Sequence, residues 1–384
     1  MRPVYSIHLS TAKSWRGGEN QVWLLARGLL ERGDRVLVIA PRDAPLLQRC
    51  REAKIPTSEL HVSGELDLLG AYKLAGLVGR EKPDVLHAHD GHALLPARMA
   101  CWFKARQSLN LIAHRRTVFP LKGRWKYQGR VDRIVAISAA VRERLLSDGI
   151  SEQSIRVVFS GLEFPEAGGG GQELRRTLGI SDDAFVIAHA AALTGEKRQS
   201  DILRALARVL ETLKDSQFAN VHLIIAGTGK LAHTLQQDAQ QQGIAKHVHF
   251  LGFVQDLKPV WGASNAAVFA SEAEGLCTAL VEAQGAGLPA VITRAGGMTE
   301  IVDEGKTGLT ADVGDTEALA RNLEKLVRDR ELCRKMGAAA AQNARAKFSA
   351  ARMVAGISDV YQEVLANRNA VVGTELTSNG GRQS

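Results

Sequence analysis

The segment Glu272–Ala283 carries the densest set of side chains that could do chemistry. It follows a short apolar run, Ala266–Ala270, and contains Gly275 just before a stretch with helical character. A strand, a glycine turn and a helix in that order direct several unpaired backbone N–H groups to one point, which suits a diphosphate. Glu274 and Glu282 flank this turn, so both carboxylates could accept hydrogen bonds from sugar or ribose hydroxyls beside it.

Two more glycine turns follow apolar runs in the same half of the chain. Gly227-Thr228-Gly229 comes after Val221–Ala226, and Gly296-Gly297 comes after Ala290–Thr293. Two surface glutamates would be the simpler explanation of the acidic pair if it stood alone. Three glycine turns at strand ends of one sheet instead indicate a ligand cleft, because ligands of parallel sheets bind off the carboxyl ends of the strands.

Short β-rich runs alternate with amphipathic stretches along the chain. This alternation predicts βα units around a parallel sheet, which would position the glycine turns. In the first half we expect strands at Val4–Leu9, Arg35–Ala40, Asp84–Ala88, Leu111–His114, Arg133–Ile137 and Arg156–Phe159. In the second half we expect them near Phe185–His189, Val221–Ala226, His247–Leu251, Ala266–Ala270, Ala290–Thr293 and Gly308–Thr310. The fold class is therefore α/β, with two Rossmann-like, doubly wound parallel sheets facing across a cleft.

Four segments divide the chain. Gly168–Gly171 has no side chains to pack and is interpreted as a linker. We expect one Rossmann-like domain at 1–165 and a second at 166–348. A helix at 349–370 should pack back on the first domain, and the tail at 371–384 should be disordered because it lacks periodicity.

The composition is globular, with 45% hydrophobic and 23% charged residues in 384. Residues 1–165 contain 26 Lys and Arg against 16 Asp and Glu, and the remainder contains 23 against 25, so the net charge of +8 belongs to the first half. The segment Arg98–Arg133 contains ten basic residues and only one acidic residue, Asp132. The basic residues are Arg98, Lys104, Arg106, Arg115, Arg116, Lys122, Arg124, Lys126, Arg130 and Arg133. A solvated helix face would normally mix both signs, so we favour an anionic partner, either a phosphorylated acceptor or an acidic membrane surface.

Several classes of protein are disfavoured. The apolar runs are strand-sized and no basic-then-apolar leader opens the chain, so we expect a cytoplasmic protein, peripheral at the inner face of the membrane if it contacts one. The four cysteines, Cys50, Cys101, Cys277 and Cys333, are too scattered for a disulfide framework or a thiolate metal site.

Together these residues resemble the GT-B fold retaining glycosyltransferases of family four, the glycosyl transferases of group 1. The most specific motifs are Glu274-Gly275-x6-Glu282, Gly287-x-Pro289 and Gly296-Gly297-x2-Glu300. Further likeness lies at Gly17-Gly18, His87-x-His89, Ile137-Ser138, Ser160-Gly161, Lys197, Gly227-x-Gly229 and Phe250-x-Gly252, so that it covers about residues 4–365.

The resemblance implies a role for each matching residue. Glu274, His89 and Lys197 would be catalytic, with Lys197 neutralising the diphosphate and Glu274 binding the transferred sugar. The donor would be bound by Gly17, Gly18, Lys197, Arg198, Gly227, Gly229, Phe253, Glu274, Gly275, Leu276, Cys277, Thr278 and Glu282. The resemblance also implies that the domain at 1–165 binds the acceptor and the domain at 166–348 the nucleotide sugar. The charge of Arg115, Arg116 and Lys126 in the first domain predicts that they bind the acceptor. Ala191 and Ala192 replace the arginine usual in the family, and Arg198 or Arg116 could supply its charge.

These roles predict metal-independent transfer, without a cofactor, of a sugar from a nucleotide-diphosphate donor. A helix N-terminus and a lysine can stabilise the departing diphosphate, and no DxD pair is present to bind a metal. Retention of configuration is implied by the resemblance. The acceptor is expected to be an anionic glycolipid or saccharide such as a lipopolysaccharide core.

Other functions remain open at this stage. A sugar-phosphate synthase on the same fold is the nearest alternative. A zinc-dependent hydrolase could use His87, His89 and His92, although a parallel βα scheme is the wrong scaffold for the metallo-β-lactamase pattern that they resemble. A nucleic-acid binder would leave Glu274 and Glu282 without a role, so we expect no nucleic-acid partner, and no GxGxxG follows the first strand to favour a dinucleotide enzyme.

Overall fold

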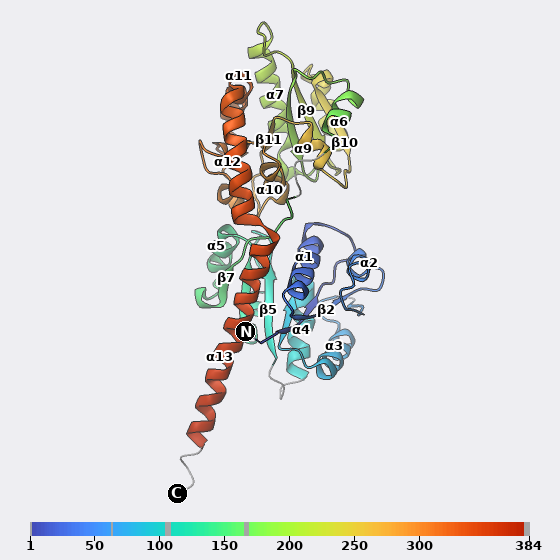
Figure 1. Ribbon diagram of the computed structural model, residues 1–384, viewed down its shortest axis with the longest axis vertical. Coiled ribbons are helices and arrows are strands. Elements are labelled where there is room, and N and C mark those ends of the chain that lie inside the picture. Colours follow the sequence, from blue (N-terminus) through green and yellow to red (C-terminus); the bar gives the residue numbers. More distant parts are fainter. Residues whose placement is uncertain (1, 63, 104–108, 165–168, 380–384) are drawn as a thin grey trace. The chain divides into compact units, whose positions relative to one another are not determined.

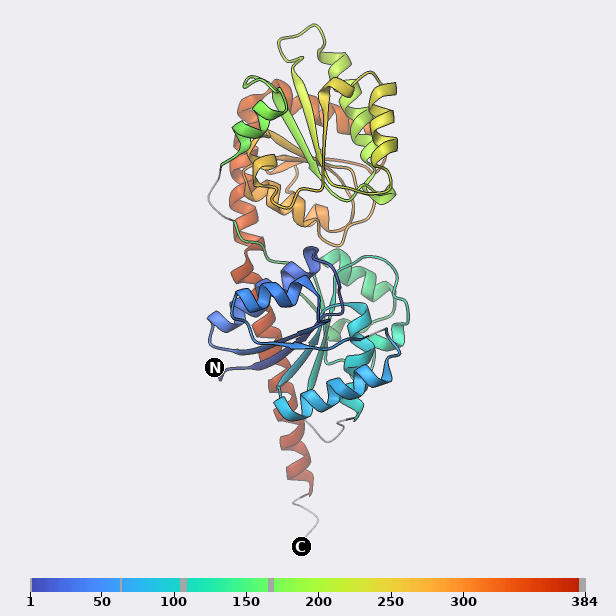
Figure 2. The same cartoon turned by 90° about the vertical axis from the view of Figure 1, so that its right-hand side faces the viewer.

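The protein is described by a computed structural model that covers residues 2–62, 64–103, 109–164 and 169–379 (Figures 1 and 2). The chain divides into two compact units. Unit 1 comprises Met1–Gly161 and Ala350–Ser384, and unit 2 comprises Leu162–Ser349. Each unit contains one parallel sheet packed against helices (Figure 2), which confirms the predicted pair of Rossmann-like domains.

Unit 1 is built on a seven-stranded sheet in the order β3-β2-β1-β4-β5-β6-β7. Its strands are β1 (Tyr5–Leu9), β2 (Arg35–Ala40), β3 (Thr57–Glu59), β4 (Val85–Ala88), β5 (Asn110–Arg115), β6 (Arg133–Ala136) and β7 (Ile155–Val157). Every neighbouring pair is parallel. β1 and β4 are buried along their whole length, as expected of central parallel strands, although β1 carries Ser6 and His8 and β4 carries His87.

The helices of unit 1 connect these strands in βα order. They are α1 (Gly17–Glu31), α2 (Pro45–Glu52), α3 (Leu68–Glu81), α4 (Gly91–Phe103), α5 (Ala139–Ser147) and the C-terminal α13 (Ala350–Asn379), with short 3-10 turns η1 (Arg124–Tyr127) and η2 (Glu152–Ser154). The order of the strands reverses between β1 and β4, which makes the carboxyl ends of these two strands the switch point of the sheet.

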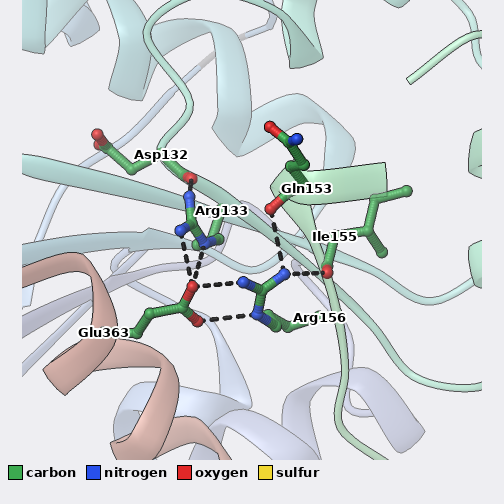
Figure 3. A network of polar contacts seen from close by, with 6 residues as sticks. All are labelled: Asp132, Arg133, Gln153, Ile155, Arg156 and Glu363. Atoms are coloured by element: carbon green, nitrogen blue, oxygen red, sulfur yellow. Dashed lines mark hydrogen bonds and ion pairs between the residues drawn. The ribbon is translucent and has the colours of Figure 1, made fainter. Parts of the chain in front are cut away.

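The C-terminal helix α13 joins unit 1 although it follows unit 2 in the sequence. Its buried stripe, which includes Met353, Ile357 and Val364, packs into one core with α1 and the sheet. Glu363 fastens the helix to the edge of the sheet: its Oε1 lies 2.7 Å from Arg133 Nη2, and its Oε2 accepts from Arg156 Nε at 2.8 Å (Figure 3).

Unit 2 has a six-stranded parallel sheet in the order β10-β9-β8-β11-β12-β13. The strands are β8 (Phe185–Ala190), β9 (Val221–Ala226), β10 (Val248–Gly252), β11 (Ala266–Phe269), β12 (Ala290–Thr293) and β13 (Gly308–Ala311). The helices are α6 (Gly171–Thr177), α7 (Gln199–Leu213), α8 (Ala232–Gln241), α9 (Lys258–Gly262), α10 (Thr278–Gly285), α11 (Thr316–Arg328) and α12 (Arg330–Phe348), with 3-10 turns η3 (Gly195–Lys197), η4 (Ala245–His247) and η5 (Gly296–Glu300). The switch point here lies between β8 and β11, beside the Glu274 turn.

The structure differs from the sequence-based expectations at the junctions. The first segment of unit 1 ends at Gly161 rather than at residue 165. Residues 165–168 of the expected linker lie outside the described residues, but Gly171 begins α6, and a Cβ there would lie 2.3 Å from the carbonyl carbon of Gly262. Gly171 is therefore a packed position.

The C-terminal tail was expected to be disordered from residue 371, whereas the structure describes helix α13 as far as Asn379. No proline interrupts this stretch, so the helix continues, since each added residue forms a further backbone hydrogen bond. The last five residues, 380–384, lie outside the described residues. No described helix is both long and apolar enough to span a bilayer.

Candidate active site

Glu274 lies in the turn after β11, in contact with the lysine that was predicted to accompany it. Its carboxylate forms an ion pair with Lys197 Nζ, and its Oε1 also accepts a hydrogen bond from Ser271 Oγ at 3.0 Å. Glu274 is buried. The turn therefore holds a carboxylate and an ammonium group side by side in a partly desolvated site, where their electrostatic interactions are strengthened.

Lys197 reaches this turn from η3, at the carboxyl end of β8. Burial by itself would lower the pKa of Lys197, but Glu274 and Cys277 outweigh it, so the pKa is raised above its ordinary value. Lys197 is therefore a cation at neutral pH, as neutralisation of a diphosphate requires.

The N-terminus of α10 lies directly beside this ion pair. Cys277 caps the helix with its backbone, and the first intrahelical hydrogen bond runs from Val281 N to Cys277 O at 3.2 Å. The backbone N–H groups of Thr278 and Ala279 precede that bond, so the helix itself does not satisfy them. Leu276 and Cys277 are buried under the turn, and burial raises the pKa of the Cys277 thiol, so this cysteine is a packed thiol.

The glycines of η5 pack against the Glu274 turn. A Cβ on Gly296 would lie 2.1 Å from the carbonyl oxygen of Glu274, and one on Gly297 would lie 2.1 Å from that of Gly275. Gly297 N also donates to Glu274 O at 3.0 Å. Both glycines are needed because the two turns meet backbone to backbone, and this contact fixes the backbone of Glu274.

The third glycine turn supports the loop that carries Lys197. Gly227 has φ +146, and a Cβ there would lie 1.9 Å from Ala191 O. A Cβ on Gly229 would lie 2.2 Å from Leu193 O, and Leu193 N donates to Thr228 O at 2.9 Å. Gly227 and Gly229 therefore act by allowing close approach of the β8 loop.

Glu282 lies one turn into α10 and has an environment of its own. Burial raises its pKa to about 7, the indole of Trp261 acts against this shift, and Asp256 adds to it. The charges of Glu274, Lys197 and Glu282 all act on the Cys277 thiol, so the three groups surround one end of α10.

Two predicted donor contacts lie elsewhere in unit 2. The guanidinium of Arg198 pairs with Asp201 at 2.6 Å and lies 3.6 Å from Glu272. It does not contact Glu274, so the structure gives it a structural partner instead of a free charge. Phe253 follows β10 and is 75% exposed, without a described ring contact.

In unit 1, Gly17 and Gly18 form the first turn of α1, and Arg116 lies over them. A Cβ on Gly18 would lie 3.8 Å from Arg116 Cδ. Burial lowers the pKa of Arg116 to about 10, while Glu19 and Asp90 act in the opposite direction, so the guanidinium remains charged. Within the described part of the chain its Nη1 has no hydrogen-bond partner.

Four buried histidines lie at the switch point of the same sheet, next to Arg116. They are His8 on β1, His87 on β4, His89 just after β4 and His114 on β5. The pKa of each is lowered, chiefly by burial, and that of His8 falls to about 3. All four are therefore neutral at physiological pH.

Arg116 determines the tautomers of two of them, because a guanidinium can only donate. Arg116 Nη2 lies 3.3 Å from His89 Nδ1, so that nitrogen accepts and the proton of His89 is on Nε2. This N–H donates to His8 Nδ1 at 2.9 Å, which leaves the proton of His8 on Nε2, 3.0 Å from Ser6 Oγ. Both ring nitrogens of His89 thus have hydrogen-bond partners inside the protein. Within this series of hydrogen bonds, Arg116 Nη1 is the donor without a partner among the described residues.

A second arm ties the cluster to α13. His87 Nδ1 lies 2.8 Å from the Tyr361 hydroxyl, and His87 Nε2 lies 3.2 Å from His114 Nδ1. His8, His114 and Tyr361 were not singled out from the sequence. The only signal was the histidines in two expected strands, and a strand histidine is more often a packed group than a functional one.

The predicted zinc set is not assembled. His92 is exposed and lies 3.7 Å from Glu65, whereas His87 and His89 are buried. Among the described residues, the one trio whose ligand atoms come together is His8, His87 and His89, within 4.8 Å of one another. His92 was chosen from its closeness in sequence, but α4 begins at Gly91 and its first turn carries His92 away from the cluster.

Of the predicted acceptor residues, Arg116 alone joins this cluster. Arg115 donates to Phe119 O, and Lys126 is buried in an ion pair with Glu65. Lys126 therefore supports the surrounding loop in the described structure and does not present a free ammonium group.

Two Rossmann-like units, each built on a parallel sheet, are the architecture of the GT-B glycosyltransferases. Two family models match the chain: "Glycosyl transferases group 1" over residues 171–343 and "Glycosyltransferase Family 4" over residues 15–163. The protein belongs to this group 1 family of GT-B glycosyltransferases.

Individual relatives agree with this assignment. The putative glycosyltransferase EpsD of Bacillus subtilis is 34% identical over 190 residues, which are 50% of this chain and 48% of EpsD, so the chain spans about half the length of this relative. The lipopolysaccharide core biosynthesis glycosyltransferase LpsE of Rhizobium meliloti is 27% identical over 92% of this chain and 96% of LpsE. Among solved structures, Anabaena HepE in complex with UDP and glucose has a TM-score of 0.80 at 21% identity, covering 94% of this chain and 99% of HepE.

Proposed function

We propose that the protein is a retaining glycosyltransferase that moves a sugar from a nucleotide-diphosphate donor to an anionic glycolipid or saccharide, such as a lipopolysaccharide core. The observation that carries this proposal is the Lys197–Glu274 pair at the N-terminus of α10, between two glycine turns. A cation and free N–H groups beside a carboxylate suit a ligand with a diphosphate next to hydroxyls.

The donor would occupy unit 2. Lys197 and the N–H groups of Cys277 and Thr278 would bind the diphosphate, and Glu274 would accept hydrogen bonds from the sugar hydroxyls. Glu282, one turn further along α10, would hold the ribose. The solved complexes of HepE with UDP and glucose support a donor of this class.

In the proposed reaction the bond between the anomeric carbon and the diphosphate oxygen breaks while a bond to the acceptor hydroxyl oxygen forms. The proton of that hydroxyl passes to the departing diphosphate, which would act as the base on the same face of the sugar. Lys197 and the tip of α10 would stabilise the charge that develops on the diphosphate, so no metal is required for that task. Retention and metal independence remain parts of this proposal.

The acceptor would bind to unit 1, whose basic surplus favours an anion. Arg116 is the best-placed contact, because its Nη1 has no partner among the residues that the structure describes and its position is held by His89. The name of LpsE supports a lipopolysaccharide acceptor. A sugar-phosphate synthase would also need a cation at the position of Arg116. The acceptor test must therefore distinguish a synthase from a transferase that acts on a glycolipid.

The donor site is tested by thermal unfolding with UDP-, GDP- and ADP-sugars. A donor at about 100 times its dissociation constant should stabilise the protein by about 2.7 kcal/mol. Lys197→Met and Glu282→Ala should abolish most of this gain, Glu274→Ala should mainly lower turnover, and Lys246→Ala, at an exposed lysine on η4, should change nothing. Stabilisation that survives Lys197→Met and Glu282→Ala would exclude this donor site.

The acceptor is tested with phosphorylated and dephosphorylated forms of one glycolipid, and with free sugar phosphates. We expect faster transfer to the phosphorylated glycolipid, and a loss of that preference in Arg116→Met. Equal rates on both forms would exclude an anionic acceptor, and transfer to a free sugar phosphate alone would favour the synthase.

A further inference from the structure

Unit 1 exposes an unusual set of large apolar side chains on two neighbouring helices. We call it the α3–α4 surface, made of Leu66, Leu68, Leu69, Tyr72, Trp102 and Phe103. Trp102 is 69% exposed and Tyr72 is 67% exposed. Single exposed apolar residues are ordinary, but a contiguous group that includes aromatic rings marks an interaction site.

These side chains form one surface rather than scattered positions. Tyr72 on α3 meets Phe103 on α4 edge to face, with ring centroids 6.1 Å apart, and Phe103 lies 5.5 Å from Trp102. Leu68 and Leu69 lie one turn before Tyr72 on the same helix, so they share its side of α3.

The surface extends over α4 to the 3-10 turn η1. Arg98 lies one turn before Trp102, and its guanidinium carbon lies 5.8 Å from the ring centroid of Trp125, which is itself 55% exposed. Arg98 also donates a hydrogen bond to Trp125 O. Tryptophan is enriched where proteins meet the interface between lipid headgroups and acyl chains, and both Trp102 and Trp125 lie near this arginine.

The charge around the α3–α4 surface is basic. Lys73, beside Tyr72, and Arg124, beside Trp125, are exposed. Two acidic residues precede α3: Asp67 Oδ1 caps the helix by accepting from Gly70 N at 2.8 Å, and Glu65 forms an ion pair with Lys126. Apolar rings in a basic surround suit an apolar layer covered by negative charge.

We propose that the α3–α4 surface docks on a bilayer that contains anionic lipid, with Trp102, Tyr72 and the leucines entering the headgroup region and Arg98, Lys73 and Arg124 meeting lipid phosphates. A protein partner would not by itself account for the basic surround. An anionic glycolipid acceptor lies in a membrane, and the α3–α4 surface is where the protein would contact it. The biological reason for docking rests on the proposed function. Docking can fail while donor binding in unit 2 is retained.

The test is sedimentation of the full chain with vesicles of phosphatidylcholine, with and without phosphatidylglycerol. We expect binding that needs phosphatidylglycerol and weakens in high salt. The double variant Tyr72→Ser/Trp102→Ser should bind at least about tenfold more weakly. Lys73→Glu should bind more than about fivefold more weakly, since loss of one lysine near an acidic surface costs a factor of about five and the new carboxylate adds repulsion.

Two matched variants serve as controls. Val313→Ser changes an exposed apolar residue of unit 2, and Arg32→Glu reverses an exposed charge at the end of α1, so both should bind vesicles as the unmodified chain does. Donor-induced thermal stabilisation should be the same in every variant, which shows that unit 2 remains folded, and an unchanged unfolding midpoint without donor should show the same of unit 1. A quenching measurement with brominated lipid should reach Trp102, and Trp102→Phe should remove most of the quenching.

Three results would overturn the proposal. One is equal binding to vesicles with and without phosphatidylglycerol, and another is unchanged binding in the Tyr72→Ser/Trp102→Ser variant. The third is a stable dimer, without vesicle binding, that this double variant converts to a monomer, because the occupant would then be a second copy of the chain.

Discussion

Replacing Glu282 by glutamine should stabilise the protein at alkaline pH and have much less effect at acid pH. Burial raises the pKa of this carboxyl to about 7, above its ordinary value of 4.5. The folded protein therefore retains a proton on Glu282 at a pH where the unfolded chain has released it. The contribution of this proton to folding stability is complete below about pH 4.5, and it is lost as the pH rises through about 7.

The size of the effect follows from that difference. A shift of one pKa unit corresponds to about 1.4 kcal/mol, so the charged form of Glu282 destabilises the folded protein by up to about 3 kcal/mol above pH 7. Glutamine has nearly the same shape and no charge. Between pH 5 and pH 8 the advantage of Glu282→Gln over the unmodified chain should therefore grow by about 2 kcal/mol.

The assay is denaturant unfolding of both proteins at pH 5 and pH 8, followed by a signal from unit 2. Glu173→Gln, at an exposed position on α6, is the control and should show no such change with pH. A free-energy difference for Glu282→Gln that is the same at both pH values, or a variant less stable than the unmodified chain at pH 8, would refute the assignment of a buried, protonated carboxyl at this position.

Three further predictions test other parts of the structure. Gly227→Ala should lower the free energy of unfolding by more than about 2 kcal/mol and weaken donor binding, because its Cβ would meet Ala191 O at 1.9 Å, whereas Gly243→Ala, with positive φ and open space, should lose only about 1 kcal/mol in the same denaturation assay. Hydrogen bonds from Arg156 and Arg133 outweigh the effect of burial and lower the pKa of Glu363. Glu363→Gln should therefore destabilise the chain by about 1 kcal/mol at neutral pH, with the loss fading in acid titration as the pH falls through that lowered pKa, and an undiminished loss at low pH would contradict the ion pairs. ¹⁵N NMR should show His8 and His89 as neutral Nε2–H tautomers that do not titrate between pH 5 and 8, and protonation of either ring in that range would refute the chain of donors that starts at Arg116.

Much of the fold could be predicted because parallel sheets leave a simple record in the sequence. Inner strands such as β2, from Val36 onward, and β11 are buried on both sides and so appear as continuous apolar runs. The elements that were missed are short or irregular. Strand β3, for example, has only three residues and none of them is apolar, so it carries no hydrophobic period.

Much of the candidate donor site could also be predicted from the sequence. Glu274, Gly275 and the capping turn of α10 are contiguous, so a local pattern records them. The link to Lys197 came from the family resemblance, because 77 residues separate it from Glu274 and no local period connects them.

The sequence by itself determined two parallel α/β sheets with glycine turns at their strand ends, since hydrophobic period and glycine placement act over a few residues. Only the tertiary structure decided which groups share an environment. His92 lies outside the histidine cluster, whereas His8 and Tyr361 belong to it, and Lys126 forms a buried ion pair with Glu65. The reason is physical. Tautomers, pKa values and burial depend on neighbours contributed by strands and helices that are distant in the chain and meet only when the core forms.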